Sequence, residues 1–109
     1  MRYIHTSEYG GPEVMKMKEG DVPDPGSGEV LIKVHAAGVN RPDVMQRQGL
    51  YPPPSCASPI LGLEVAGEVA AIGNAVSAWS VSDRLCALTN GGGYAEYVSV
   101  PAGQCRPVP

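Results

Sequence analysis

Phenylalanine is missing from the sequence, and tryptophan occurs once among its 109 residues. The core must therefore be built from small and aliphatic side chains, mainly Val, Ala, Leu and Ile. Basic residues are also few, because only eight Lys and Arg are scattered along a chain whose net charge is −3. Since phosphate backbones are bound by clustered basic side chains, this distribution argues against a nucleic acid partner.

Cysteine is scarce as well, with only Cys56, Cys86 and Cys105. Their odd number and wide spacing match neither a CxxC motif nor a zinc ribbon, so we expect free thiols in a reducing cytoplasm. No apolar run approaches the roughly 18 residues that a transmembrane helix needs, and no apolar signal core follows the first residues. The sequence therefore predicts a soluble, cytoplasmic protein without a membrane span.

Glycine and proline are abundant, with 14 and 11 residues respectively, and they separate short runs of alternating apolar residues. This combination is typical of turns in an all-β fold. The clearest runs cover 29–39 and 60–73. Their predicted buried faces are Val30, Ile32, Val34 and Ala36 in the first run, and Leu63, Val65, Val69 and Ala71 in the second. With the other runs we count six or seven strands and one helix, which predicts a mainly β fold, a small barrel or sandwich.

The helix is predicted at 40–48, between the two clearest strands. Asn40 is a favourable N-cap, Pro42 is tolerated in the first turn, and Asp43 places a negative charge there. Gly49 suits the left-handed position that follows a last helical turn. The proline-rich segment 50–59 is predicted to be a stiff, extended loop.

Few residues form a recognisable chemical motif. A zinc site needs three or four converging ligands, and His5 and His35 instead stand in strand patterns. No helix pattern follows the glycines at 91–93, so we interpret them as a hairpin turn and not as a phosphate cradle. Asn40 and Tyr51 lie at the two ends of the helix and its loop, where an amide and a phenol could hydrogen-bond to a carbonyl oxygen. A helix cap for Asn40 and packing on the prolines for Tyr51 remain open alternatives.

The chain closely resembles the amino-terminal part of the quinone oxidoreductases in three stretches, PGSGEVLIKVHAAGVNRPDVMQRQGLYPPP, PILGLEVAGEV and GGGYAEYVSVPAG. These enzymes are the zinc-free, zeta-crystallin-like branch of the medium-chain dehydrogenase/reductase superfamily. The resemblance covers essentially the whole chain and implies a GroES-like, partly open β-barrel with one short helix. It also implies an enzyme, homo-oligomeric in its complete form, that uses NADPH to reduce a quinone or an enone-like carbonyl.

The resemblance assigns roles to individual residues. It places Asn40 and Tyr51 as catalytic and substrate-binding residues where the quinone meets the nicotinamide ring, with Asn40 also touching the cofactor. Leu63 would line the substrate side, and Asp43 and Glu64 would support the site structurally. Zinc-binding relatives carry a cysteine and a histidine where this sequence has Asn40 and Leu63, so the resemblance implies that no zinc is bound.

Two positions depart from the family pattern. Ser82 and Cys56 stand where relatives usually have glycine. Either residue would strain a turn if its φ angle is positive, because a side chain is disfavoured in that region.

The family continues into a Rossmann domain that holds the dinucleotide phosphates, and 1–109 covers only the part before it. We therefore expect 1–109 to be the substrate-side catalytic domain of a longer enzyme. We also expect it to be inactive alone, because hydride transfer requires that the donor be held against the acceptor. Two other interpretations stay open: a stand-alone, co-chaperonin-like binding or assembly module, and a fragment of a zinc-type alcohol dehydrogenase.

Overall fold

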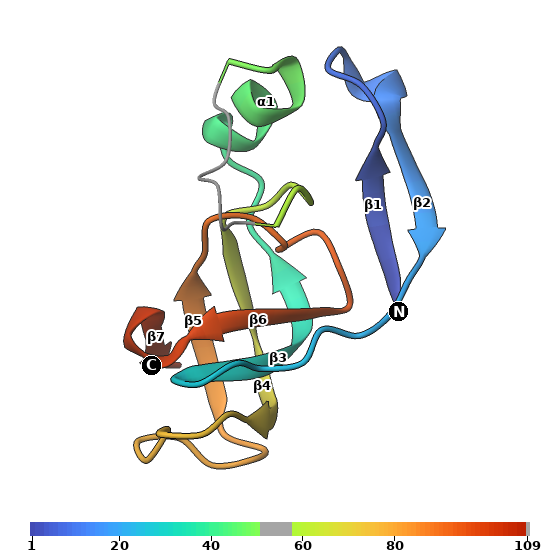
Figure 1. Cartoon of the computed structure of the whole chain (residues 1–109). Helices are drawn as coiled ribbons and strands as arrows, with labels where there is room; N and C mark the ends of the chain where they lie inside the picture. Colours follow the sequence, from blue (N-terminus) through green and yellow to red (C-terminus); the bar gives the residue numbers. More distant parts are fainter. Residues whose placement is uncertain (51–57, 109) are drawn as a thin grey trace.

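A computed structural model of the chain describes residues 1–50 and 58–108, which contain seven strands and one α-helix (Figure 1). The strands are β1 (Arg2–Thr6), β2 (Met15–Glu19), β3 (Glu29–Ala37), β4 (Glu64–Ile72), β5 (Arg84–Leu88), β6 (Tyr97–Pro101) and β7 (Cys105–Pro107). The helix is α1 (Arg41–Gln48), and no helix of the described part is long and apolar enough to cross a bilayer. The predicted mainly β fold with one short helix is confirmed.

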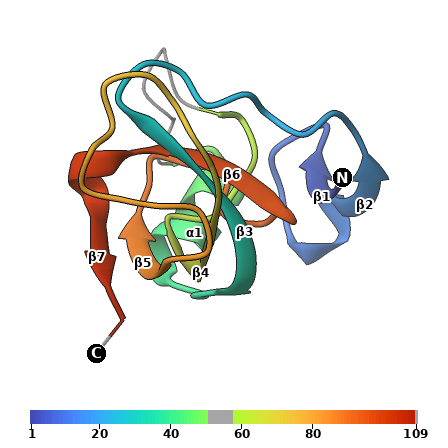
Figure 2. The same cartoon turned by 90° about the horizontal axis from the view of Figure 1, so that it is seen from below.

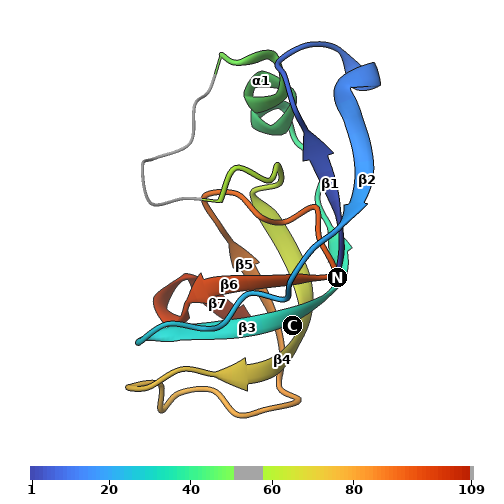
Figure 3. The ribbon, with the colours of Figure 1, turned by 45° about the vertical axis from the view of Figure 1, so that its right-hand side comes forward.

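Five strands form one antiparallel sheet in the order β6–β3–β4–β5–β7, and β1 and β2 form a separate two-stranded ribbon. Seen from below, the sheet is strongly twisted and the ribbon stands to one side of it (Figure 2). The helix α1 lies beyond one end of the sheet, next to the far end of the ribbon (Figure 3). Because β6 and β7 are not paired with each other, the sheet stays open, as in a partly open barrel.

The core is made of aliphatic side chains from all five strands of the sheet. Its buried members are Val30, Ile32, Val65, Val69, Leu85, Ala87, Val98, Val100 and Cys105. No large aromatic ring takes part in this set, so its cohesion comes from many small, close contacts.

The predicted inner face of β3 is correct for Val30 and Ile32 but wrong for Ala36, which is exposed. The register between β3 and β4 shifts between Val34 and Ala36, so that one extra residue of β3 is accommodated there. This bulge turns the following residue, Ala37, toward the core in place of Ala36.

The strand β4 begins later than predicted, at Glu64 instead of residue 60. Gly62 adopts φ +103°, a conformation that interrupts extended backbone and that only glycine adopts readily. The residues before Glu64 therefore form a loop, and Leu63 lies half-buried at its end.

The prediction of a hairpin turn at 91–93 is wrong. The strand β5 pairs with β4 and β7, whereas β6 pairs with β3 on the other side of the sheet. The glycines therefore belong to a crossover, in which Gly92 N–H donates to the Ile60 carbonyl and Tyr94 N–H donates to the Leu61 carbonyl. A glycine-rich run marks a change of direction, but it does not specify which strand is reached next.

Ser82 has φ +78°, so the condition for strain foreseen from the sequence is met. We expect Ser82→Gly to raise the free energy of unfolding by about 0.5–1 kcal/mol, because the relief of left-handed strain exceeds the entropy that glycine loses on folding. Urea denaturation with an unchanged m value measures this change. Ser77→Gly, in the same exposed loop but without a positive φ, is the control and should leave stability unchanged or lower it. An equal or lower midpoint for Ser82→Gly would contradict the prediction.

Candidate functional site

The helix α1 begins where the sequence pattern places it. Asn40 is the N-cap in an extended conformation, Pro42 lies in the first turn, and Gly49 closes the helix at φ +82°. Asp43 Oδ2 accepts a hydrogen bond from the Asn40 backbone N–H at 3.0 Å. This bond satisfies an otherwise unpaired N–H at the helix start, so Asp43 contributes directly to the geometry of the N-cap.

The side chain of Asn40 points to the first residue of β4. Asn40 Nδ2 donates to Glu64 Oε1 at 3.3 Å, between residues 24 positions apart, and both side chains are exposed. Gly38 lies against the same carboxylate, because a Cβ atom there would be 2.0 Å from Glu64 Oε1. The turn between β3 and α1 thus brings two of the residues predicted for the site into contact.

A half-buried tyrosine and a buried aspartate form a hydrogen-bonded pair next to Asn40. Tyr94 Oη donates to Asp43 Oδ2 at 2.6 Å, and Asp43 is only 2% exposed. Among the described residues, the second carboxylate oxygen of Asp43 has no hydrogen-bond partner. Burial raises the pKa of Tyr94, and the Asp43 carboxylate raises it further by accepting the hydrogen bond and by repelling a phenolate, while the charge of Arg47 acts in the opposite direction. The Tyr94 hydroxyl therefore keeps its proton and can act as a hydrogen-bond donor.

Sequence reasoning missed Tyr94. Its position after the glycine run gave no indication of its partner, because the contact with Asp43 depends on the crossover from β5 to β6. The one available signal was chemical: a tyrosine in a mostly apolar segment usually needs a hydrogen-bond partner.

Two cavities adjoin the site. One of about 160 Å³ is lined by Asp43, Tyr94 and Arg47 together with apolar side chains of the ribbon, of α1 and of the loops before α1 and β4. The other, of about 320 Å³, borders Glu64 and Arg106 on the side of β5 and β7. Each cavity combines polar groups with apolar walls, as small-molecule sites do, and Asp43 and Glu64, which line one cavity each, both hydrogen-bond to Asn40.

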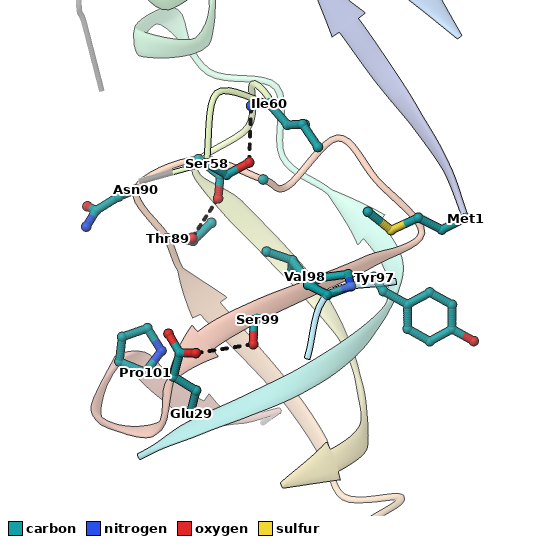
Figure 4. Close-up of a pocket in the computed structure, with 13 residues that line it drawn as sticks. Met1, Glu29, Ser58, Ile60, Thr89, Asn90, Tyr97, Val98, Ser99 and Pro101 are labelled. Carbon is teal, nitrogen blue, oxygen red and sulfur yellow. Dashed lines mark hydrogen bonds between the residues drawn. The ribbon is translucent and has the colours of Figure 1, made fainter. Parts of the chain in front are cut away.

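A further cavity of about 340 Å³ lies along β6, and none of the predicted site residues that the structure describes lines it (Figure 4). Its polar lining includes Glu29, which Ser99 Oγ approaches at 3.5 Å, and Ser58, whose hydroxyl accepts from the Ile60 N–H. Size alone therefore does not select the predicted site.

The side chains that could ligate a metal ion are dispersed in the described part of the chain. Among the described residues, no group of three or more His, Cys, Asp or Glu side chains lies close enough to hold a metal ion. His35 instead pairs with Glu68 across β3 and β4, with Nε2 and Oε1 at 3.3 Å. Tyr51 and Cys56 lie outside the described residues.

The fold and the sequence both match known proteins. The family model of the alcohol dehydrogenase GroES-like domain matches residues 26–109. The rat quinone oxidoreductase is 41% identical over 100% of this chain and 34% of its own length. A mycobacterial protein complexed with NADPH superposes with a TM-score of 0.90 at 40% identity, over 100% of this chain and 34% of its own. The quinone oxidoreductase of Escherichia coli, also complexed with NADPH, gives a TM-score of 0.91 at 33% identity, over 100% of this chain and 33% of its own.

The chain spans about a third of the length of these proteins. The matches confirm the predicted GroES-like fold and the resemblance to the amino-terminal part of quinone oxidoreductases.

Proposed function

The chain belongs to the family of alcohol dehydrogenase GroES-like domains, and from this premise we propose that it is the substrate-side catalytic domain of an NADPH-dependent quinone oxidoreductase. The observation that carries the proposal is the convergence of Asn40, Asp43 and Glu64 at one end of the sheet, through hydrogen bonds of 3.0 and 3.3 Å. The family resemblance assigns Asn40 to the active site and Asp43 and Glu64 to its structural support. Relatives called quinone oxidoreductases match the chain over its whole length.

The role proposed for Asn40 is to donate a hydrogen bond to the substrate carbonyl. Its amide nitrogen carries two hydrogens, and the bond to Glu64 Oε1 orients one of them. The second can then point to a carbonyl oxygen on which negative charge develops, and this is where a fixed donor lowers the barrier. From the resemblance we propose Tyr51 as a second donor and Leu63 as an apolar wall for a quinone or enone-like ring.

NADPH would supply the hydride in the complete enzyme. The residues described here suit only its nicotinamide end, next to Asn40. The glycines at 91–93 lead into the strand β6 and not into a helix, so they do not form the helix terminus that binds a pyrophosphate group. The phosphates would be held by the part of the enzyme that the relatives have in addition.

We further propose that the enzyme works without zinc, in the cytoplasm and as a homo-oligomer. The absence of zinc is supported by the identity of Asn40 and Leu63, because an amide and an alkyl side chain replace the cysteine and histidine of zinc-binding relatives. One zinc ion bound per chain, measured by elemental analysis, would overturn this part of the proposal.

The proposal predicts that residues 1–109 alone do not catalyse the reduction of a quinone by NADPH, whereas a chimera does. In the chimera, residues 1–109 replace the matching third of the Escherichia coli quinone oxidoreductase. Oxidation of NADPH in the presence of a quinone is the measurement. We expect turnover in the chimera and none from either part alone, because fixing the donor against the acceptor is worth roughly 10⁵-fold or more in effective concentration.

The control is the chimera assayed without quinone, which should consume no NADPH. A chimera that folds and binds NADPH but reduces neither a quinone nor an enone would contradict the proposed function. Turnover by residues 1–109 alone would contradict the expected dependence on a cofactor domain.

A further inference from the structure

One carboxylate oxygen joins the half-buried Tyr94 to the start of α1. Asp43 Oδ2 accepts the Tyr94 hydroxyl at 2.6 Å and the Asn40 backbone N–H at 3.0 Å. We infer that Tyr94 is a positioning residue, which fixes Asn40 through Asp43 and so sets the direction of the amide that faces the substrate. We call these three residues the Tyr94–Asp43–Asn40 network. The inference that Tyr94 positions Asn40 depends on the geometry alone, whereas its consequence for catalysis rests on the proposed function.

Backbone hydrogen bonds and close packing hold Tyr94 in place, so that it can orient other groups. Its N–H donates to the Leu61 carbonyl at 2.9 Å, and its carbonyl accepts the Ile4 N–H at 2.9 Å. Its ring and backbone pack against Gly62, where a Cβ atom would lie 2.7 Å from both. Since the ribbon and the loop before β4 both hold this residue, the hydroxyl has little freedom to move.

Asp43 depends on Tyr94 for its orientation. The carboxylate is almost fully buried, and its two bonds to described residues converge on the same oxygen. When a buried carboxylate loses a donor, the cost in free energy exceeds that of one ordinary hydrogen bond, because water cannot replace the missing partner. We therefore expect the group to turn toward solvent when the tyrosine hydroxyl is removed, and to release the Asn40 N–H as it turns.

Asn40 has few other restraints. Its side-chain bond to Glu64 is long, at 3.3 Å, and exposed, so it can orient the amide only when the backbone of Asn40 is held in place. The bond from its backbone to Asp43 is half-buried and ties it to the first turn of α1. The network therefore supplies the rigidity that an exposed donor needs if it is to stabilise a developing charge.

The first test uses residues 1–109 and the substitution Tyr94→Phe, which removes only the hydroxyl. We expect hydrogen exchange at the Asn40 backbone amide to speed up about tenfold relative to the amide of Val34, as the loss of a partner for a buried charged group implies. The Val34 amide, in β3, donates to the Glu96 carbonyl just before β6 and serves as the reference for a change that is not confined to the start of α1. Tyr97→Phe, which removes a hydroxyl from another half-buried tyrosine, should change neither amide.

Unchanged exchange at Asn40, or an equal acceleration at Asn40 and Val34, would overturn the inference, because a purely structural role predicts a uniform effect. If Tyr94→Phe does not fold, Asp43→Asn addresses the same contact with little change in volume. It should likewise accelerate hydrogen exchange at Asn40 more than at Val34. An equal acceleration at the two amides would overturn the inference.

The second test uses the chimera described above. Tyr94→Phe should lower kcat about tenfold and leave KM for NADPH unchanged, since a misdirected donor weakens transition-state stabilisation and not cofactor binding. An active chimera whose kcat does not respond would overturn the catalytic consequence. A chimera that is inactive with Tyr94 in place counts against the proposed function, and the exchange measurement still decides the positioning of Asn40.

Discussion

Gly67→Val in β4 is expected to prevent the chain from folding into a stable domain. A Cβ atom at Gly67 would lie 2.1 Å from the Lys33 carbonyl oxygen and 3.1 Å from Ile32 Cγ2. The first contact is with backbone, which cannot move aside as a side chain can. Relief would require β3 and β4 to separate at the centre of the sheet, where Gly67 pairs with Val34. Overpacking of side chains alone costs about 1–3 kcal/mol, and displaced backbone costs more.

A domain of this size has roughly 5–15 kcal/mol of stability to lose. We therefore expect Gly67→Val to lack the cooperative urea transition of the parent, measured by circular dichroism at 25 °C. Gly103→Val is the matched control, because nothing lies within 4 Å of a Cβ atom there and its φ is not positive. It should unfold close to the parent midpoint. A cooperative Gly67→Val transition at the parent midpoint would show that β3 and β4 are not packed as described.

Local chemistry explains why much of the fold was predictable from the sequence. The apolar run around Val30 and Ile32 predicts a buried strand within a few residues, and Leu31 between them is buried as well. The start and end of α1 follow from Asn40 and Gly49, whose preferences need no distant partner. The types of β3, β4 and α1 were therefore predicted correctly, whereas the start of β4, at Glu64 and not at residue 60, was not.

Pairing between distant segments explains what the sequence could not show. The glycine run at 91–93 signals a turn equally well in a hairpin and in a crossover, and only the completed sheet distinguishes the two. The extra residue that β3 accommodates between Val34 and Ala36 likewise becomes evident only when β3 and β4 are paired.

The same limit applies to the site. Asn40 and Glu64 were identified by resemblance, whereas their contact and the role of Tyr94 depend on three segments that meet only in the folded chain.

Asn40→Asp in the chimera is expected to lower kcat by about 100-fold or more. Loss of one donor to a developing oxyanion costs roughly 10²–10³ in rate. The substitution also places a carboxylate at the end of α1 nearest Glu64, whose Oε1 now accepts from Asn40 at 3.3 Å. Aspartate is as good an N-cap as asparagine, so the fold should be retained and the loss should appear in turnover. Steady-state oxidation of NADPH with a quinone measures it, with KM for NADPH as the second readout.

Two comparisons separate the loss of the donor from the added charge. Asn74→Asp makes the same change at an exposed position between β4 and β5, and the loop that joins these strands lies at the end of the sheet opposite α1 (Figure 1), so kcat should be unchanged. Asn40→Asp combined with Glu64→Gln removes the repulsion between two carboxylates but leaves position 40 without its amide. If the donor matters, kcat stays low in the double variant. If kcat of the double variant returns to the parent value, repulsion between the carboxylates caused the loss. If kcat of Asn40→Asp alone stays within about threefold of the parent value, Asn40 does not take part in the chemistry, because loss of an oxyanion donor lowers the rate far more.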